Sequence, residues 1–218
     1  MGFDDLKNEI EKMFPNAKKD DDLGKYAVLK YPKYFSMMKM RVFRYDLPDY
    51  GSIMVMNTSM MGLMKLNTLS FTPNEGKDVP FLLIDTMSMM KKRLAYVEFY
   101  NTTEKDFPSL YALKKKYQDI SDYQEKPAWY VKERMEGSLI KCRIKKDEEG
   151  LMDMVLYALS LYKNEIDKAD VDIDNVKRLS SFSDRMIKEG NPSSSTLQKV
   201  LGREQAEDFF RKIVMRLK

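Results

Sequence analysis

The chain has 218 residues, of which 43% are hydrophobic and 33% charged, and its net charge is +4. Such proportions are typical of a globular protein with a buried core, and this mild charge does not indicate a nucleic-acid partner. With no histidine and a single cysteine, Cys142, the sequence excludes an internal disulfide, His-ligated metals and Ser-His-Asp or Cys-His catalysis. Acid–base chemistry is left to Asp, Glu, Lys, Tyr or Cys.

The sequence lacks membrane-targeting segments and the common motifs of nucleotide-binding and hydrolase sites. No apolar run approaches the roughly 20 residues of a membrane-spanning helix, and the acidic, amphipathic residues 1–14 are unlike a signal peptide. There is also no Gly-rich phosphate-binding motif and no nucleophile elbow. We therefore expect a cytoplasmic protein with no membrane partner, no nucleic-acid partner and no bound nucleotide cofactor.

The N-terminal half predicts one helix followed by strands. Residues 3–14 carry apolar side chains at helical spacing. From residue 26 to residue 100, short apolar runs alternate with turn residues, and the short links favour hairpins and an antiparallel sheet. The predicted strands are 26–31, 39–45, 52–57, 63–71, 79–85 and 93–100.

The segment 107–218 predicts mainly helices. They are 107–120, 148–169, 173–190 with Gly190 as its C-cap, and 196–217, which Gly202 can break in two. Strands such as SIMVMN are apolar on both faces, so helices should cover both faces of the sheet. The predicted fold is α+β, a three-layer α/β/α sandwich with a central antiparallel sheet, in a single domain spanning residues 1–218.

Two acids lie inside apolar strand runs and are the candidates for chemistry. Asp85 ends the run VPFLLID, and period two places it on the face of Phe81 and Leu83. Glu98 lies in LAYVEFY, which we expect to be the neighbouring strand. One interpretation is that the strand ends at Asp85 and the carboxylate meets water. The other is that it faces a pocket, where burial raises its pKa and lets it handle protons.

The methionines and the basic runs each allow two interpretations. The 18 methionines indicate either a soft-packed core or an adaptable pocket for a large apolar ligand, with methionine pairs at 37–38, 60–61 and 89–90 near strand ends. The basic runs 91–93, 114–116 and 141–146 are either solvated surface or a docking face for an acidic protein.

Two segments resemble the ferredoxin-dependent bilin reductases. In LNTLSFTPNEGKDVPFLLIDTMSMMKKRLAYVEFY the marks are Pro73, Pro80, Asp85 and Glu98, and NPSSSTLQKVLGREQAEDFFRKIVM is similar to the closing element of that family. The resemblance implies an α/β/α sandwich and reduction of a linear tetrapyrrole by single electrons from reduced ferredoxin or flavodoxin, with no bound flavin, metal or nicotinamide.

The resemblance also implies roles for particular residues. Asp85 is expected to be the proton donor, and Asn67, Thr68, Glu98 and Asn191 are expected to bind substrate. The sequence departs from the family where Thr68 replaces a His or Asn, where Met56 stands near a Glu, and where an acid beside Asn191 is lost. Two alternatives to a reductase therefore stay open: a tetrapyrrole or apolar-ligand binding protein of the same fold, and a structural or interaction protein in which Asp85 merely ends a strand.

Overall fold

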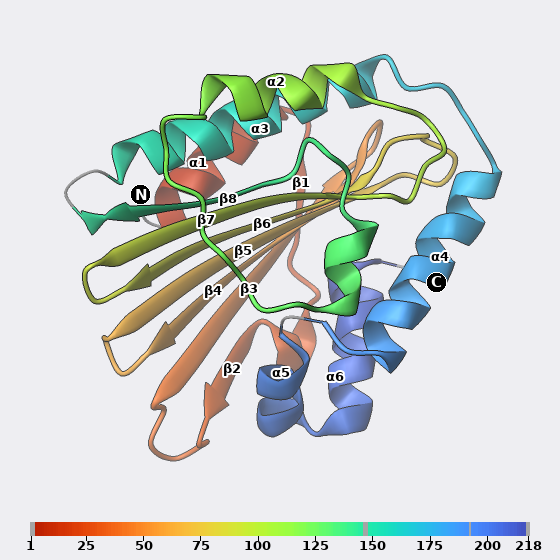
Figure 1. Ribbon diagram of the computed structural model, residues 1–218. Coiled ribbons are helices and arrows are strands. Elements are labelled where there is room, and N and C mark those ends of the chain that lie inside the picture. The colour runs from red at the N-terminus through yellow and green to blue at the C-terminus, as the bar shows by residue number, and fades with distance from the viewer. Residues whose placement is uncertain (1–2, 146–147, 192, 217–218) are drawn as a thin grey trace.

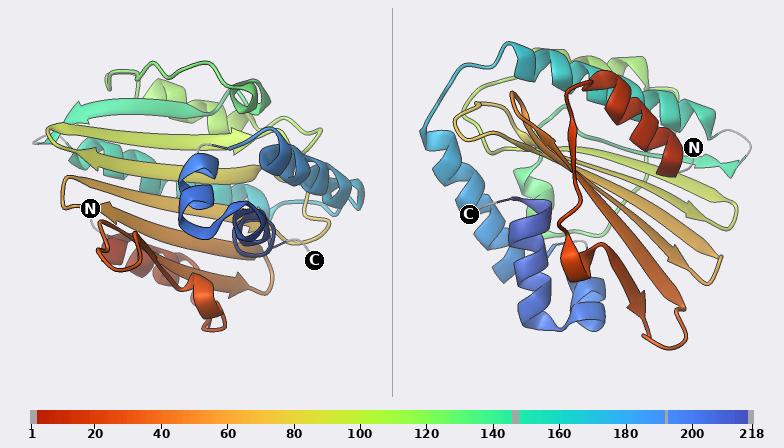
Figure 2. Two further views of the ribbon diagram at one scale, coloured as in Figure 1. Left: turned by 90° about the horizontal axis from the view of Figure 1, so that it is seen from below. Right: turned by 180° about the vertical axis from the view of Figure 1, so that it is seen from behind.

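A twisted antiparallel sheet lies between two layers of helices (Figure 1 and Figure 2). The computed structural model describes residues 3–145, 148–191 and 193–216. Within them, eight strands form one sheet in the order β1-β3-β4-β5-β6-β7-β8, and β2 also pairs with β3. The strands are β1 Lys18–Asp20, β2 Val28–Tyr31, β3 Met38–Leu47, β4 Gly51–Met60, β5 Met64–Pro73, β6 Phe81–Met89, β7 Lys92–Tyr100 and β8 Leu139–Ile144. The helices are α1 Phe3–Met13, α2 Pro108–Lys116, α3 Glu149–Asp167, α4 Asp174–Lys188, α5 Ser194–Leu201 and α6 Arg203–Phe209. The predicted α/β/α sandwich is confirmed.

The sequence-based strand assignment missed the two edge strands. All six predicted strands are present as β2 to β7, which pair as consecutive hairpins. β1 is only three residues long and polar, so it carries no apolar signal. β8 interrupts the segment 107–218, which was expected to be mainly helical. In β8 the apolar residues alternate with Lys141 and Arg143, so we interpreted a half-buried strand as part of a basic run.

Each face of the sheet has its own core. On one face, alternate residues of β4 to β7 pack against α1, α2 and α3, and the largest buried side chains there include Phe71, Phe99 and Tyr162. On the other face, Phe81 and Tyr100 pack against α4, α5 and α6 through Phe182 and Phe209. The strand sequences are apolar at consecutive positions because both of these faces are covered.

The C-terminal segment crosses the second face and is tied to it by two hydroxyl groups. Gly202 has a φ of 80°, a left-handed conformation that glycine adopts without strain, and it separates α5 from α6 as predicted. A π-helical turn, Phe210–Val214, then follows α6. Ser70 and Thr72 of β5 donate hydrogen bonds of 3.2 and 3.1 Å to the carbonyl of Val214. These bonds fix the π-helical turn on the sheet.

No helix in the described ranges is both long and apolar enough to cross a membrane.

Candidate functional site

A small cavity of about 30 Å³ lies between β4, β5 and β6 on one side and the C-terminal helices on the other. Its walls are apolar except for one carboxyl group and three small polar side chains. The lining residues are Met54, Met56, Thr68, Phe81, Leu83, Asp85, Met186, Asn191, Ser193, Leu197, Phe209, Phe210 and Val214. A mostly apolar cavity with a few convergent polar groups is the usual form of a small-molecule site.

Strand β6 places Asp85 in this cavity. Side chains alternate along a strand, and β6 sends Phe81, Leu83 and Asp85 toward the C-terminal helices while Leu82 and Ile84 enter the other core. β6 continues to Met89, so Asp85 lies inside the strand and does not end it. The interpretation that the strand ends at Asp85 is therefore wrong.

The Asp85 carboxyl has a single hydrogen-bond partner in the described structure, the hydroxyl of Thr68. These residues are direct cross-strand partners, and Thr68 Oγ1 donates to Asp85 Oδ1 over 2.5 Å. The Asp85 side chain retains partial solvent exposure, but protein atoms surround it densely. This burial raises the pKa of Asp85 to about 6, and the bond from Thr68 opposes the rise. Asp85 can therefore exchange a proton close to neutral pH.

Glu98 lies on the same face, one strand further along, but outside the cavity lining. It is the cross-strand partner of Leu83 and is 1% exposed. Arg134 forms ion pairs with both Glu98 and Glu125. Burial raises the pKa of Glu98 to about 8, Arg134 opposes the rise, and the charge of Asp85 adds to it. Glu98 is thus electrostatically coupled to Asp85 while its direct partner is an arginine.

The loop between α4 and α5 forms one wall of the cavity. Asn191 Nδ2 donates to the carbonyl of Met186 over 3.2 Å, and its Oδ1 accepts from the backbone N–H of Ser193 over 3.0 Å. Trp129 Nε1 donates to the carbonyl of Gly190 over 2.7 Å, which ties this loop to a distant segment. Asn191 therefore lines the cavity, but its amide already organises the loop.

The predicted site residues divide into two groups. Asp85, Thr68 and Asn191 line the cavity together. Asn67 and Glu98 do not, and Asn67 belongs to the opposite face, where it joins Asn57 and Thr86 in a ladder of side-chain hydrogen bonds of 2.6 and 3.1 Å. Adjacent residues of a strand point to opposite faces, so Thr68 and Asn67 cannot both face the same ligand.

Sequence reasoning missed most of the apolar wall. The cavity methionines are Met54, Met56 and Met186, whereas the methionine pairs that we associated with a pocket mouth lie at hairpin tips. The sequence around Leu197 and Phe209, in α5 and α6, does not reveal that these side chains line the cavity. Helical spacing shows that one face of a helix is buried, but it does not show what that face packs against. Among the described residues, no group of three Cys, Asp or Glu side chains is arranged to hold a metal ion.

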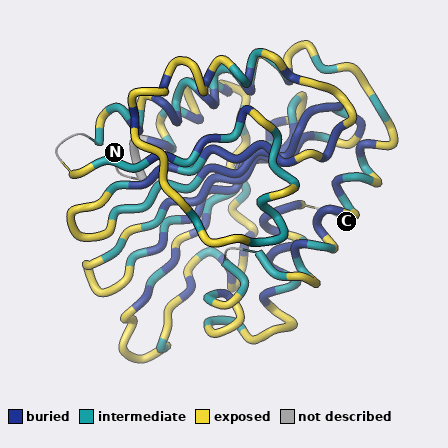
Figure 3. Tube along the Cα trace, viewed as in Figure 1, coloured by how far each residue is buried: buried dark blue, intermediate teal, exposed yellow. Residues whose placement is uncertain are grey.

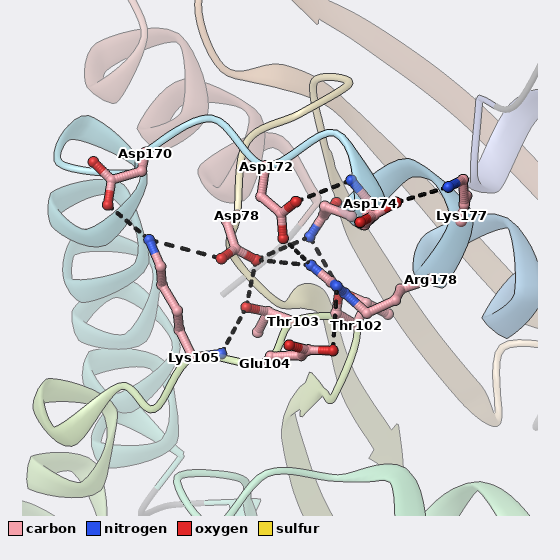
Figure 4. Close-up of polar contacts among 11 residues, drawn as sticks. Asp78, Thr102, Thr103, Glu104, Lys105, Asp170, Asp172, Asp174, Lys177 and Arg178 are labelled. Carbon is pink, nitrogen blue, oxygen red and sulfur yellow. Dashed lines mark hydrogen bonds and ion pairs between the residues drawn. The ribbon is translucent and has the colours of Figure 1, made fainter.

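A second polar cluster fixes the N-terminal end of α4 and is separate from the cavity lining (Figure 4). Its centre is Asp78, which is 4% exposed and accepts a bond of 2.6 Å from Thr103. Arg178 of α4 lies 3.4 Å from Asp78, and Lys105 lies 3.7 Å away. Asn175, also of α4, donates to the carbonyl of Thr102 over 3.0 Å. The buried Asp78 carboxylate thus has hydrogen-bond and ion-pair partners on several sides, which indicates that the cluster holds α4 in place.

Comparisons with known proteins find similarity in structure and none in sequence. No protein-family model matches the chain. A search by sequence of curated proteins also finds no match. Phytochromobilin synthase from tomato, solved in complex with biliverdin, matches with a TM-score of 0.80 and 9% identity over 99% of this chain and 83% of that one. PcyX matches with a TM-score of 0.59 and 14% identity over 100% of this chain and 99% of that one.

These structural similarities establish that the chain has the same fold as the two solved proteins. The resemblance to the ferredoxin-dependent bilin reductases, or to a divergent relative that shares their fold, is confirmed at that level, since a biliverdin-bound phytochromobilin synthase aligns with nearly the whole chain. At 9% and 14% identity, the roles of individual residues have to be argued from the geometry of the site itself.

Proposed function

We propose that this protein binds an open-chain tetrapyrrole, or a similar extended conjugated molecule, in the cavity and reduces it. The observation that carries the proposal is Asp85, a carboxyl group with a pKa of about 6 on the wall of an otherwise apolar cavity. A group that titrates near the working pH is suited to donate a proton to a bound substrate.

The proposed reaction is the reduction of one double bond of the conjugated system. It requires two electrons and two protons. Two molecules of reduced ferredoxin or flavodoxin are each oxidised by one electron, Asp85 supplies one proton and is reprotonated from water, and water supplies the second proton. The protein binds no cofactor in this scheme, and the acidic donor docks against a basic run of the surface.

Two observations support the choice of ligand. A structural neighbour of the same fold was solved in complex with biliverdin. The cavity of about 30 Å³ is far smaller than the roughly 300–1,000 Å³ of typical small-molecule sites, so a bilin requires its walls to move apart. Methionines at positions 54, 56 and 186 give the walls a soft, polarisable surface that can adapt to an extended conjugated ligand.

A second candidate function is ligand binding without chemistry. Among the described residues that line the cavity, Asp85 alone has a titratable side chain, and the other polar groups belong to Thr68, Asn191 and Ser193. The acid that the resemblance would place beside Asn191 is not in the sequence. A site with a single proton donor has less capacity for a multi-proton reduction than a site with two.

The experiment that separates these functions is an anaerobic absorbance titration with biliverdin, followed by addition of reduced ferredoxin. A perturbed bilin spectrum that then changes stepwise supports the reductase. A perturbed spectrum that stays static with an active donor supports the binding protein. If the spectrum is never perturbed, the proposed ligand is wrong.

A further inference from the structure

Three hairpins carry exposed apolar tips at one end of the sheet. The tips connect β2 to β3, β4 to β5 and β6 to β7, and Figure 3 shows them as exposed segments on the same side of the molecule. Nine of the fourteen exposed large hydrophobic side chains in the described part of the chain lie there. These nine, which we call the apolar tips, are Tyr31, Tyr34, Phe35, Met37, Met60, Met61, Leu63, Met89 and Met90.

The tips lie side by side because of the sheet register. Met38, Met60, Met64 and Met89 form one row of cross-strand partners at the ends of β3 to β6. Neighbouring strands are about 4.8 Å apart, so the three tips are spaced by about 10 Å and span about 20 Å. The most exposed side chains of the apolar tips are Tyr34 at 91%, Phe35 at 81% and Met90 at 77%. Scattered apolar residues on a surface are ordinary, but nine large exposed apolar side chains gathered at one end of the sheet indicate an interaction site.

Lysines surround the apolar tips, and acids do not. The sequence has no Asp or Glu in residues 23–45, 50–74 or 86–97. Six lysines flank the tips, and we call them the tip lysines: Lys30, Lys33, Lys39, Lys65, Lys91 and Lys92. In the described residues none of the six forms an ion pair, whereas nearby Arg93 is paired with Glu148. The net charge of the three hairpin segments is therefore positive, and no carboxylate of the described chain forms an ion pair with a tip lysine.

We propose that the three hairpin tips attach this protein to the surface of an anionic lipid bilayer. Phe, Tyr, Met and Leu side chains on protruding tips insert into the headgroup region, and the tip lysines contact lipid phosphates. The shape favours a bilayer over a protein partner, because separate convex tips need a matching concavity in a folded protein, while a deformable bilayer accepts them individually. This differs from the sequence-based expectation of no membrane partner, which considered only spanning and signal segments.

The proposal does not depend on the reduction chemistry, and sedimentation with extruded vesicles tests it. Wild-type protein should bind phosphatidylcholine vesicles that contain phosphatidylglycerol, should bind pure phosphatidylcholine vesicles weakly, and should be released by high salt. Recovery of the wild type in the supernatant with the anionic vesicles would overturn the proposal.

Matched double variants separate the contribution of the tip lysines from that of the apolar side chains. Lys33→Glu with Lys91→Glu should lower the partition coefficient by more than roughly thirtyfold, because each lysine lost costs about fivefold and each added carboxylate is repelled by the anionic lipid. The control Lys115→Glu with Lys188→Glu changes the net charge equally but lies away from the tips. Phe35→Ser with Leu63→Ser should lower it at least roughly tenfold. Here the control is Val171→Ser with Ile173→Ser, since Val171 and Ile173 are 81% and 78% exposed.

Two results would contradict the proposal even if the wild type binds vesicles. Equal losses in the tip variants and in their controls would show a general charge or hydrophobic effect. Undiminished vesicle binding by the tip variants, together with loss of electron transfer from reduced ferredoxin, would assign the tips to an acidic protein. The exposed positions of all substituted residues favour retained folding, which far-UV circular dichroism checks.

Discussion

Thr68 and Asp85 face each other across β5 and β6, and the threonine hydroxyl donates a hydrogen bond of 2.5 Å to the carboxylate. This contact is the one hydrogen bond of Asp85 in the described chain, in a cavity wall that is mostly apolar. Burial favours the neutral acid and the hydrogen bond favours the anion, and the balance gives a pKa of about 6. The behaviour of Asp85 and Thr68 variants should depend on these two opposing effects on the pKa of Asp85.

Replacing Asp85 with Asn should stop turnover and leave ligand binding intact. Asn has nearly the same shape but cannot donate a proton as an acid does, so the rate should fall by roughly 10²–10⁴-fold. The measurement is biliverdin affinity by absorbance titration together with the rate with reduced ferredoxin. Asp49→Asn, in the exposed β3–β4 turn, serves as the matched control and should keep full activity. A fully active Asp85→Asn variant would remove Asp85 from the mechanism.

The same substitution should stabilise the fold near neutral pH. The folded-state pKa of Asp85 is raised from 3.8 to about 6, so between these values the folded protein binds a proton that the unfolded chain has lost. Stability contributed by this group is therefore present at low pH and is lost as the pH rises from about 4 to about 6. The loss amounts to at most about 3 kcal/mol. Urea unfolding should show Asp85→Asn more stable than wild type at pH 7, with little difference at pH 4. Equal stabilities at both pH values would contradict the raised pKa.

The sequence predicted the sheet and the position of Asp85 because both depend on local patterns. Apolar strand runs with short links specify hairpins, and period two specifies which residues share a face with Asp85. The same rule separates Asn67 from Thr68, and applying it to each residue would have removed Asn67 from the expected substrate contacts.

The other parts of the site depend on contacts that are distant in sequence. Arg134 pairs with Glu98 from a segment 36 residues further along, and no periodicity marks it. Met186 and Phe209 reach the cavity from helices whose packing is set by tertiary structure. The exposure of the methionine pairs at 60–61 and 89–90 also could not be predicted, because the sequence pattern at a strand end is the same for a buried methionine and an exposed one.

Replacing Thr68 with Val should move the pH dependence of turnover upward. The hydroxyl of Thr68 lowers the pKa of Asp85, so its removal leaves burial unopposed and keeps the carboxyl protonated to higher pH. In single-turnover measurements with bound biliverdin, the wild-type rate should decline as the pH rises through about 6, and the variant should decline at a higher pH. Thr86→Val is the control, since Thr86 neighbours Asp85 in the same strand but bonds to Asn67 on the opposite face. A midpoint that does not move in Thr68→Val would show that the hydrogen bond does not control the proton donor.

Replacing Arg134 with Met should destabilise the protein strongly above pH 8, where the Glu98 carboxyl is ionised. Arg134 is the ion-pair partner of both Glu98 and Glu125, and Glu98 is almost fully buried. Removing one partner of a buried pair leaves an uncompensated charge and costs about 3–5 kcal/mol. Arg134 lowers the pKa of Glu98, so without it Glu98 takes up a proton more readily, and the destabilisation should shrink as the pH falls.

Chemical denaturation of three variants tests this account. Arg143→Met is the control, because among the described residues the Arg143 side chain has only a long hydrogen bond of 3.4 Å to the carbonyl of Asp119, and its change in stability should stay within about 0.5 kcal/mol. Glu98→Gln added to Arg134→Met should recover part of the lost stability, since a neutral amide needs no counter-charge. If Arg134→Met is as stable as wild type, or if adding Glu98→Gln restores no stability, then Arg134 does not stabilise the protein by compensating the buried charge of Glu98.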